Sequence, residues 1–201
     1  GEDFGISYEG RITKRKIRQV LPPKKEKPLD LDKISFVYNS FLDLISLSDQ
    51  DRLYLKNTRH MTEKEIDFFR LKTYPRRNIL LRKSLEEKVI AKYGSTNVLF
   101  EIPGFFKKEG EIFNFPRNDG IIIPQNDEKG RTVGIQIRLR KSNSTSSKYF
   151  WMSSINCRTD NSFKAVKNGR SPGSPMGVIY TKNKAAKEMF ITEGFFKAYT
   201  I

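Results

Sequence analysis

The sequence contains very little cysteine or histidine: Cys157 and His60 are the only residues of their types among 201. A disulfide framework is therefore excluded, and a zinc site is disfavoured because such sites use several Cys or His ligands. A single thiol fits the reducing cytosol. No apolar run approaches the roughly 20 residues of a bilayer-crossing helix, and the N-terminus lacks the layout of a signal peptide. The sequence predicts a cytoplasmic protein without a membrane role.

Familiar catalytic motifs are also missing, because the sequence contains no Walker loop, no Rossmann fingerprint and no HExxH motif. His60 sits beside a predicted helix start, which favours a cap or surface role. Cys157 lies in a polar stretch without a neighbouring histidine, which favours a free thiol over a catalytic nucleophile. Asp119 and Asp127 lie close to glycines and are expected to be turn residues.

Positive charge is abundant. Lys and Arg number 38 against 23 for Asp and Glu, which gives a net charge of +15. Such an excess favours a polyanionic partner, with nucleic acid ahead of an anionic membrane; the alternative is a merely solvated basic surface. The length allows one domain or two small ones.

Residues 1–30 are predicted to be a basic, proline-containing linker. Pro22, Pro23 and Pro28 remove backbone donors and fix φ, which favours an extended chain. The basic residues of positions 11–18 either contact phosphates or solvate the linker. A leader of this composition suggests a piece of a longer protein.

Residues 31–94 are predicted to form a helical subdomain. Apolar residues between Ile34 and Ile45 recur at steps of three and four, as they do on one face of a helix. Ser48 or Asp49 is expected to cap a second helix.

Two further helices are predicted in this subdomain. Thr62 and Glu65 have the spacing of a capping box, and the helix that they open is expected to end at Tyr74-Pro75. Another amphipathic pattern runs over residues 78–93, with Gly94 as its stop.

Residues 95–188 are predicted to form a mixed β-sheet basic subdomain. Two hairpins are expected, one from Ile102–Phe106 with Glu111–Phe115 and one from Gly120–Pro124 with Thr132–Leu139. Further strands are expected at Lys148–Trp151, Val178–Tyr180 and Met189–Thr192. The predicted fold class is α+β, with a helical unit followed by a mixed sheet.

The strand Thr132–Leu139 and its surroundings form the candidate binding surface. Period-two alternation places Arg138 and Arg140 on one face, opposite the aliphatic side chains. These arginines, with Lys141 and Lys148, are candidate phosphate contacts, and Tyr149 is placed to stack on a base. The neighbouring Trp151 is expected to be a core residue.

The dipeptide Glu193-Gly194 is the candidate catalytic feature. A carboxylate at the end of a strand, followed by a turn glycine, suits the rim of an α/β sheet, where ligands and metal ions often lie. Taken alone this pattern is weak evidence for a site, because a strand–Glu–Gly–helix junction is often only a turn.

Read in order, these segments resemble the catalytic core of bacterial replicative, DnaG-type DNA primases. Residues 47–75 resemble the helical entrance to that core, and residues 120–138 resemble its "riMFPIrDxxGrviGFgGR" hairpin. Lys148-Tyr149 with Ser153-Ser154 resembles "pKYlNSpe". Residues 191–197, Ile-Thr-Glu-Gly-Phe-Phe-Lys, resemble "vvEGymD", the opening of the TOPRIM fold. The segments Ile102-Pro-Gly-Phe-Phe106 and Trp151-Met-Ser-Ser154 look closer to primase-like proteins of phages, plasmids and integrative elements.

The resemblance implies roles for particular residues. Residues 189–201 would begin a truncated TOPRIM domain, with Glu193 as a catalytic ligand of Mg²⁺ or Mn²⁺. Arg138 and Lys148 would contact the template or nucleotides. Lys197 stands where the family has an acidic residue. The family's later Asp-x-Asp ligands would lie beyond Ile201, and zinc would be held only by an N-terminal ribbon outside this chain.

The resemblance therefore implies a fragment that is inactive alone. The complete protein would use a single-stranded DNA template and ribonucleotides to synthesise short RNA primers for replication of a mobile element or phage, with a replicative helicase as a further partner. The alternatives are a non-catalytic nucleic-acid-binding protein and a docking module for a replication partner.

Overall fold

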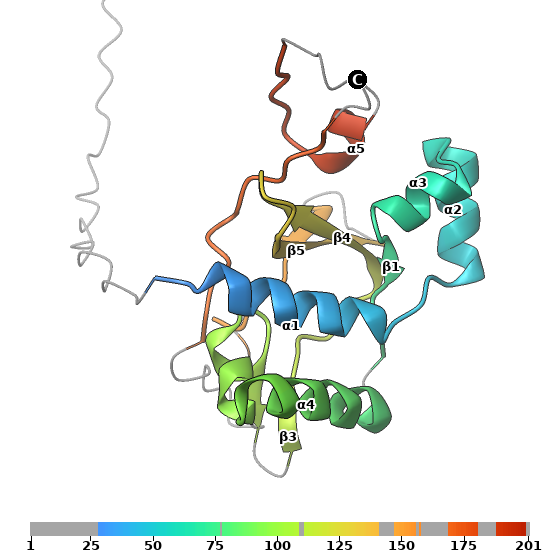
Figure 1. Cartoon of the computed structure of the whole chain (residues 1–201). Coiled ribbons are helices and arrows are strands. Elements are labelled where there is room, and N and C mark those ends of the chain that lie inside the picture. The colour runs from blue at the N-terminus through green and yellow to red at the C-terminus, as the bar shows by residue number, and fades with distance from the viewer. Residues whose placement is uncertain are drawn as a thin grey trace, which may run out of the picture.

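A computed structural model describes residues 28–76, 78–108, 111–140, 147–155, 157, 169–180 and 188–199 (Figure 1). The helices are α1 (Leu31–Asp43), α2 (Asp49–Arg59), α3 (Glu63–Phe68), α4 (Ile79–Tyr93), the 3₁₀ helix η1 (Thr96–Glu101) and α5 (Phe195–Tyr199). The strands are β1 (Lys72–Thr73), β2 (Phe106–Lys108), β3 (Glu111–Asn114), β4 (Gly120–Asn126), β5 (Thr132–Leu139) and β6 (Tyr149–Trp151). The predicted α+β class, with helices ahead of the sheet, is confirmed.

Most of the predicted linker and Lys141 lie outside the described residues. In the part of the chain that the structure covers, no helix is long and apolar enough to cross a membrane.

Helices α2 and α3 begin where the predicted capping residues stand. The Ser48 side chain accepts a hydrogen bond from the Asp51 N–H, and Thr62 and Glu65 make both bonds of a capping box. Asn78 caps α4, which ends at Gly94 in the left-handed conformation, with φ of 73°. Each cap satisfies donors or carbonyls that the helix leaves unpaired.

The second predicted hairpin is present, and the first is present with its first arm shifted, because β2 begins at Phe106, where the predicted arm ends. β2 pairs with β3, and β4 pairs with β5 across a turn that contains Gly130, all in antiparallel register. β4 and β5 are the centre of a sheet with strand order β1-β4-β5-β6, in which every pair is antiparallel. The sheet of the described residues is therefore antiparallel rather than mixed.

Helix α3 ends earlier than predicted, at Phe68 instead of at Tyr74-Pro75. Arg70 takes a positive φ of 52°, and the chain then forms β1, which pairs with β4. The helix gives way to this strand because Lys72 and Thr73 pair with Ile122 and Ile121, about 50 residues away along the chain. Such a distant partner leaves no mark on local periodicity.

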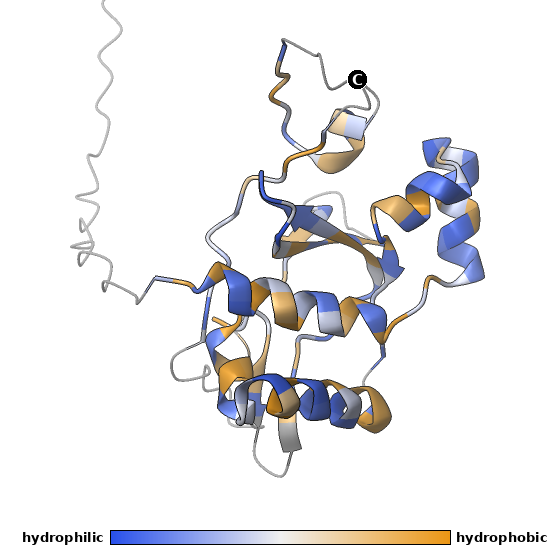
Figure 2. Cartoon of the chain, in the orientation of Figure 1, coloured by the Kyte–Doolittle hydropathy of each residue, from blue (hydrophilic) through white to orange (hydrophobic). Residues whose placement is uncertain are grey.

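The strands predicted at Val178–Tyr180 and Met189–Thr192 do not form. The Val178 N–H donates to the Asn126 carbonyl at 2.8 Å, but no ladder follows. The hydrophobic residues of the second segment, which leads into α5 (Figure 2), have no sheet to join within the described residues. Their side chains are consequently exposed, Met189 by 84% and Ile191 by 83%.

The central sheet separates two hydrophobic clusters. Ile122, Ile135 and Ile137 belong to the first cluster, which includes residues of α1 and α4. Ile121 and Ile123 face the other way and belong to the second cluster, with residues of α2, α3 and α5. Because successive side chains of a strand point to opposite faces of the sheet, a strand such as β4 contributes side chains to both clusters. Because Arg138 follows Ile137 on β5, it lies on the side of the second cluster.

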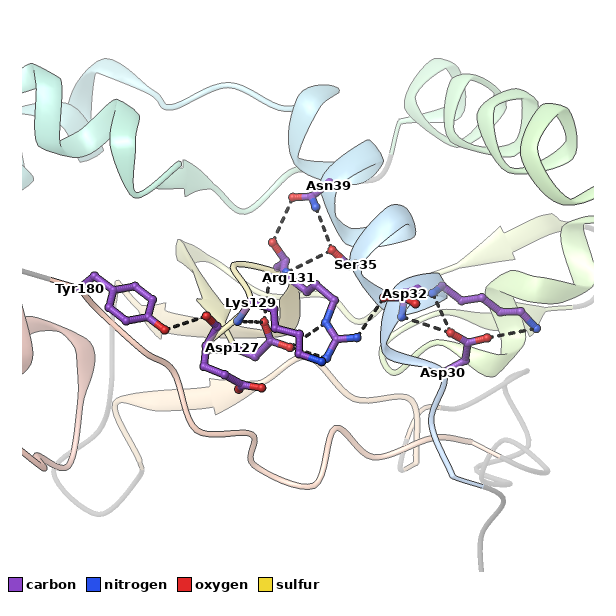
Figure 3. A network of polar contacts seen from close by, with 11 residues as sticks. Asp30, Asp32, Ser35, Asn39, Asp127, Lys129, Arg131 and Tyr180 are labelled. Atoms are coloured by element: carbon purple, nitrogen blue, oxygen red, sulfur yellow. Dashed lines mark hydrogen bonds and ion pairs between the residues drawn. The ribbon is translucent and has the colours of Figure 1, made fainter. Parts of the chain in front are cut away.

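The turn between β4 and β5 is held against α1 by a polar network (Figure 3). The Asp127 carboxylate accepts bonds from the Lys129 and Arg131 N–H groups at 3.0 and 2.9 Å, which confirms its role as a turn residue. The Arg131 guanidinium pairs with Asp127 at 2.7 Å and with Asp32 of α1 at 3.0 Å. Burial of the Asp127 carboxyl opposes ionisation, but the bonds from Arg131 outweigh it and lower its pKa. The network fixes the hairpin that carries Arg138.

Candidate nucleic-acid interface

Arg138 is the central residue of the candidate surface. Its Cζ lies 4.8 Å from the centroid of the Tyr54 ring of α2, within the range of a cation–π interaction. Its Nε is buried and makes no hydrogen bond. No carboxylate of the described residues pairs with it. The charge of Arg138 is thus offset by an aromatic ring but not by an opposite charge.

Arg140, two residues further on, is in a different state. Its Nη2 donates to Asp51 Oδ2 at 3.1 Å, its Nη1 donates to Asp51 Oδ1, and its Nε donates to Asp119 at 3.0 Å. Burial opposes the charge of this guanidinium, but the bonds to Asp51 and Asp119 prevail and raise its pKa. Asp51 also accepts from Thr73 Oγ1 at 2.6 Å. The ion pair therefore joins α2, β1 and the end of β5, and leaves Arg140 little capacity for a further acceptor.

Tyr149 lies beside Arg138 on the neighbouring strand β6, and Lys148 directly precedes that strand. Tyr149 of β6 is the register partner of Arg138, and its half-buried ring packs against the second cluster. Lys148 is exposed, and its carbonyl accepts from the Leu139 N–H at 2.9 Å. The structure therefore brings two of the predicted contacts, Arg138 and Tyr149, into register, while the Lys148 backbone bonds to the next residue of β5, Leu139.

Trp151 shares this face of β6 but is held by packing. A Cβ added at Gly134 would meet Trp151 at 2.9 Å and Pro175 at 2.6 Å, so both side chains lie directly over the Gly134 backbone. Trp151 is only half-buried, which is less than the fully buried core residue expected from the sequence. His60 is exposed and caps the end of α2 in the left-handed conformation, which agrees with the predicted cap or surface role, although the prediction associated it with the start of the next helix.

Two residues of the surface were not found from the sequence: Tyr54 and Arg59, both on α2. The Arg59 Nε donates to the Tyr54 hydroxyl at 2.7 Å. The Arg59 Cζ lies 5.6 Å from the Tyr54 ring centroid and 4.7 Å from that of Phe196 on α5. The helical pattern predicted α2, but nothing in that pattern connects its residues with β5 or α5.

Glu193 lies in the bend that leads into α5. Its carboxylate pairs with the Lys197 ammonium one turn later, and this hydrogen bond and charge lower its pKa. The Glu193 side chain is 77% exposed. No group of three or more His, Cys, Asp or Glu side chains gathers anywhere in the described part of the chain. A single exposed carboxylate with an ammonium partner does not form a Mg²⁺ site by itself.

These features define an α+β domain with a cationic and aromatic face formed by β5, β6 and α2. Neither a protein-family profile nor a curated protein matches the sequence.

Two solved structures are similar to part of the chain. The Aquifex aeolicus primase, comprising its zinc-binding and RNA polymerase domains, gives a TM-score of 0.45 at 23% identity over 63% of this chain and 32% of that chain. A DnaG primase catalytic domain bound to single-stranded DNA gives a TM-score of 0.41 at 14% identity, over 60% of this chain and 38% of that chain. This chain thus spans about a third of the length of each, and the similarity concerns the fold alone.

Proposed function

We propose that this chain is the nucleic-acid-binding part of a primase-like protein and that it binds single-stranded DNA through Arg138, Lys148 and Tyr149. The observation that carries the proposal is the guanidinium of Arg138, which lies over an aromatic ring without a carboxylate partner in the described residues. A partly buried cation of this kind is stabilised when a phosphate oxygen accepts from it.

The choice of a single strand follows from the neighbouring side chains. The half-buried Tyr149 is the register partner of Arg138, and the exposed Lys148 directly precedes Tyr149 in the chain. Single-strand-binding surfaces combine cations that follow the backbone with rings on which bases stack. The net charge of +15 adds a long-range attraction that steers a polyanion toward the protein.

We assign Arg140 a structural role in this proposal, although it was predicted as a DNA contact. Its three guanidinium nitrogens already donate to Asp51 and Asp119. Lys141, outside the described residues, stays a predicted contact.

For the complete protein we propose primer synthesis. The support is the ordered set of motifs, which resembles the primase core from residue 47 to residue 201. Ribonucleotides would be the substrates, a replicative helicase would be a further partner, and the replicon served would be a phage or mobile element. Glu193 would act as a Mg²⁺ or Mn²⁺ ligand only together with carboxylates from outside the described residues, because it belongs to no group of three or more such side chains among them. Zinc would belong to an N-terminal ribbon.

Fluorescence anisotropy with a labelled oligothymidylate over a salt series tests the binding proposal. The logarithm of the association constant is expected to fall linearly with the logarithm of salt concentration, with a slope of about −0.7 for each phosphate neutralised. Arg138→Gln and Lys148→Gln are each expected to weaken binding and to make the slope shallower by about that amount.

Lys33→Gln is the matched control, because Lys33 is also cationic but pairs with Asp30 and Glu101 at the start of α1. It is expected to bind as the unchanged protein does. Undetectable or salt-independent binding would contradict the proposal and favour the docking module.

A further inference from the structure

Two arginines share one aromatic ring on the candidate surface. The Cζ atoms of Arg59 and Arg138 lie 5.6 Å and 4.8 Å from the centroid of the Tyr54 ring. The two guanidinium groups can therefore be no farther apart than the sum of these distances. Arg59 belongs to the end of α2 and Arg138 to β5, so only the tertiary fold brings them together.

Among the described residues, neither of these arginines has an opposite charge beside it, in contrast to several neighbouring cations. Arg52 on the same helix pairs with Glu63, as does Lys56, and Arg140 pairs with Asp51. For Arg59 and Arg138, no carboxylate among the described residues lies within ion-pair distance. Two like charges that both lie against one ring repel one another, and the Tyr54 ring offsets only part of that repulsion.

The geometry holds the two side chains in place but leaves their outer nitrogens available. The Nε of Arg59 donates to the Tyr54 hydroxyl at 2.7 Å, and its guanidinium lies over the Phe196 ring. The Nη atoms of both arginines make no hydrogen bond within the described residues, and none of them is buried. Both arginines therefore present free donors with a restricted orientation, which is the arrangement that a phosphate accepts.

We infer that Arg59, Tyr54 and Arg138 form a phosphate-binding site, in which the arginine Nη groups donate to one phosphodiester of bound single-stranded DNA. The inference rests on the proposed function and adds Arg59 to it. Tyr54 is a positioning residue, because its hydroxyl and ring orient the arginines. Phe196 couples the site to α5, three residues after Glu193.

The test uses Arg59→Gln, with Arg52→Gln as the matched control. Both residues are on α2, but only Arg52 has a carboxylate partner, Glu63. In the anisotropy salt series, Arg59→Gln is expected to weaken binding several-fold and to make the slope shallower by about 0.7, whereas Arg52→Gln keeps the slope of the unchanged protein. Tyr54→Phe, which keeps the ring but loses the hydroxyl, is expected to fall between them. Circular dichroism confirms that each variant is folded.

A second measurement separates this inference from the proposed function. Thermal unfolding is followed with inorganic tripolyphosphate and, separately, with a nucleoside triphosphate, each against chloride at equal ionic strength. A phosphate site predicts that tripolyphosphate raises the Tm of the unchanged protein more than that of Arg59→Gln. A nucleoside triphosphate that stabilises far more than tripolyphosphate identifies a nucleotide rather than a DNA strand as the source of the phosphate, and overturns the phosphodiester assignment.

The outcomes are distinct. DNA binding with an unchanged slope in Arg59→Gln overturns the inference and leaves the proposed function standing. Absence of DNA binding, together with Arg59-dependent stabilisation by tripolyphosphate, supports a phosphate site but overturns the proposed function. Absence of both effects overturns both.

Discussion

Replacing Arg140 by methionine separates stability from binding on this surface. Methionine keeps much of the length and apolar volume of the arginine stem but removes the guanidinium. The change leaves the Asp51 carboxylate, whose side chain is only 3% exposed, without its cationic partner. Among the described residues, the Asp51 carboxylate then keeps only the hydrogen bond from Thr73 Oγ1, at 2.6 Å.

The magnitude follows from the burial of the two partners. Removing one member of a buried ion pair costs about 3–5 kcal/mol, because a charge is left buried and unpaired. The Arg140 side chain is 23% exposed, which admits some solvent, so the lower end of that range applies. The second partner, Asp119, is 72% exposed and adds at most about 1 kcal/mol. We expect Arg140→Met to lower the free energy of unfolding by about 3 kcal/mol.

Urea unfolding followed by circular dichroism measures this change. With a denaturant slope of about 2 kcal/mol per molar, the midpoint is expected to fall by about 1.5 M. Lys33→Met is the control, because its partners Asp30 and Glu101 are about half exposed, and its midpoint is expected to move little. The double variant Asp51→Leu with Arg140→Met is expected to recover part of the loss, since no buried charge is left unpaired.

The same variants are measured for DNA binding under folding conditions. Arg140→Met is expected to bind single-stranded DNA nearly as the unchanged protein does, whereas Arg138→Gln is not. The reasoning is refuted if Arg140→Met and Lys33→Met unfold at the same urea concentration, or if Arg140→Met weakens binding as strongly as Arg138→Gln.

Three further predictions concern the packing of α5 and the stability of α4. Burial, and then its hydrogen bond to Glu65, raise the pKa of Tyr199 to about 12. The stability that this phenol contributes is therefore present below its ordinary pKa of about 10 and is lost as the pH rises through the folded value. Because phenylalanine does not ionise, the fall in unfolding free energy between neutral and alkaline pH should be smaller in Tyr199→Phe than in the unchanged protein. The same pH profile in both proteins would contradict the assignment. Leu85→Ala, at a fully buried position of α4, is expected to cost about 2–5 kcal/mol in urea unfolding, and a cost below about 1 kcal/mol would contradict its place in the core. Gly94→Ala is expected to lower the free energy of unfolding by about 1 kcal/mol, because φ is 73° and L side chains disfavour that conformation. A Cβ there meets no atom within 4 Å, so the cost comes from the backbone alone. A neutral or stabilising effect in thermal or urea unfolding would argue against the left-handed cap.

Local features of this protein could be predicted because their causes lie within a few residues. The capping box at Thr62 and Glu65 and the left-handed stop at Gly94 need only neighbouring backbone groups. The hairpin of β4 and β5 needs a turn and two alternating segments, and the same alternation correctly separated Arg138 from the aliphatic face. Period and capping therefore led to the α+β class and to the side of β5 that carries the arginines.

Only the tertiary structure decided which charges are paired. Asp51 and Arg140 are 89 positions apart, and nothing in either local sequence shows that one neutralises the other. The end of α3 and the absence of strands at 178–180 and 189–192 likewise depend on whether a distant strand is available as a partner. By itself the sequence determined a basic chain of helices and hairpins, because charge and periodicity are local properties. Packing decided that Arg140 is held by carboxylates while Arg59 and Arg138 share the Tyr54 ring, because contacts between distant segments exist only in the folded chain.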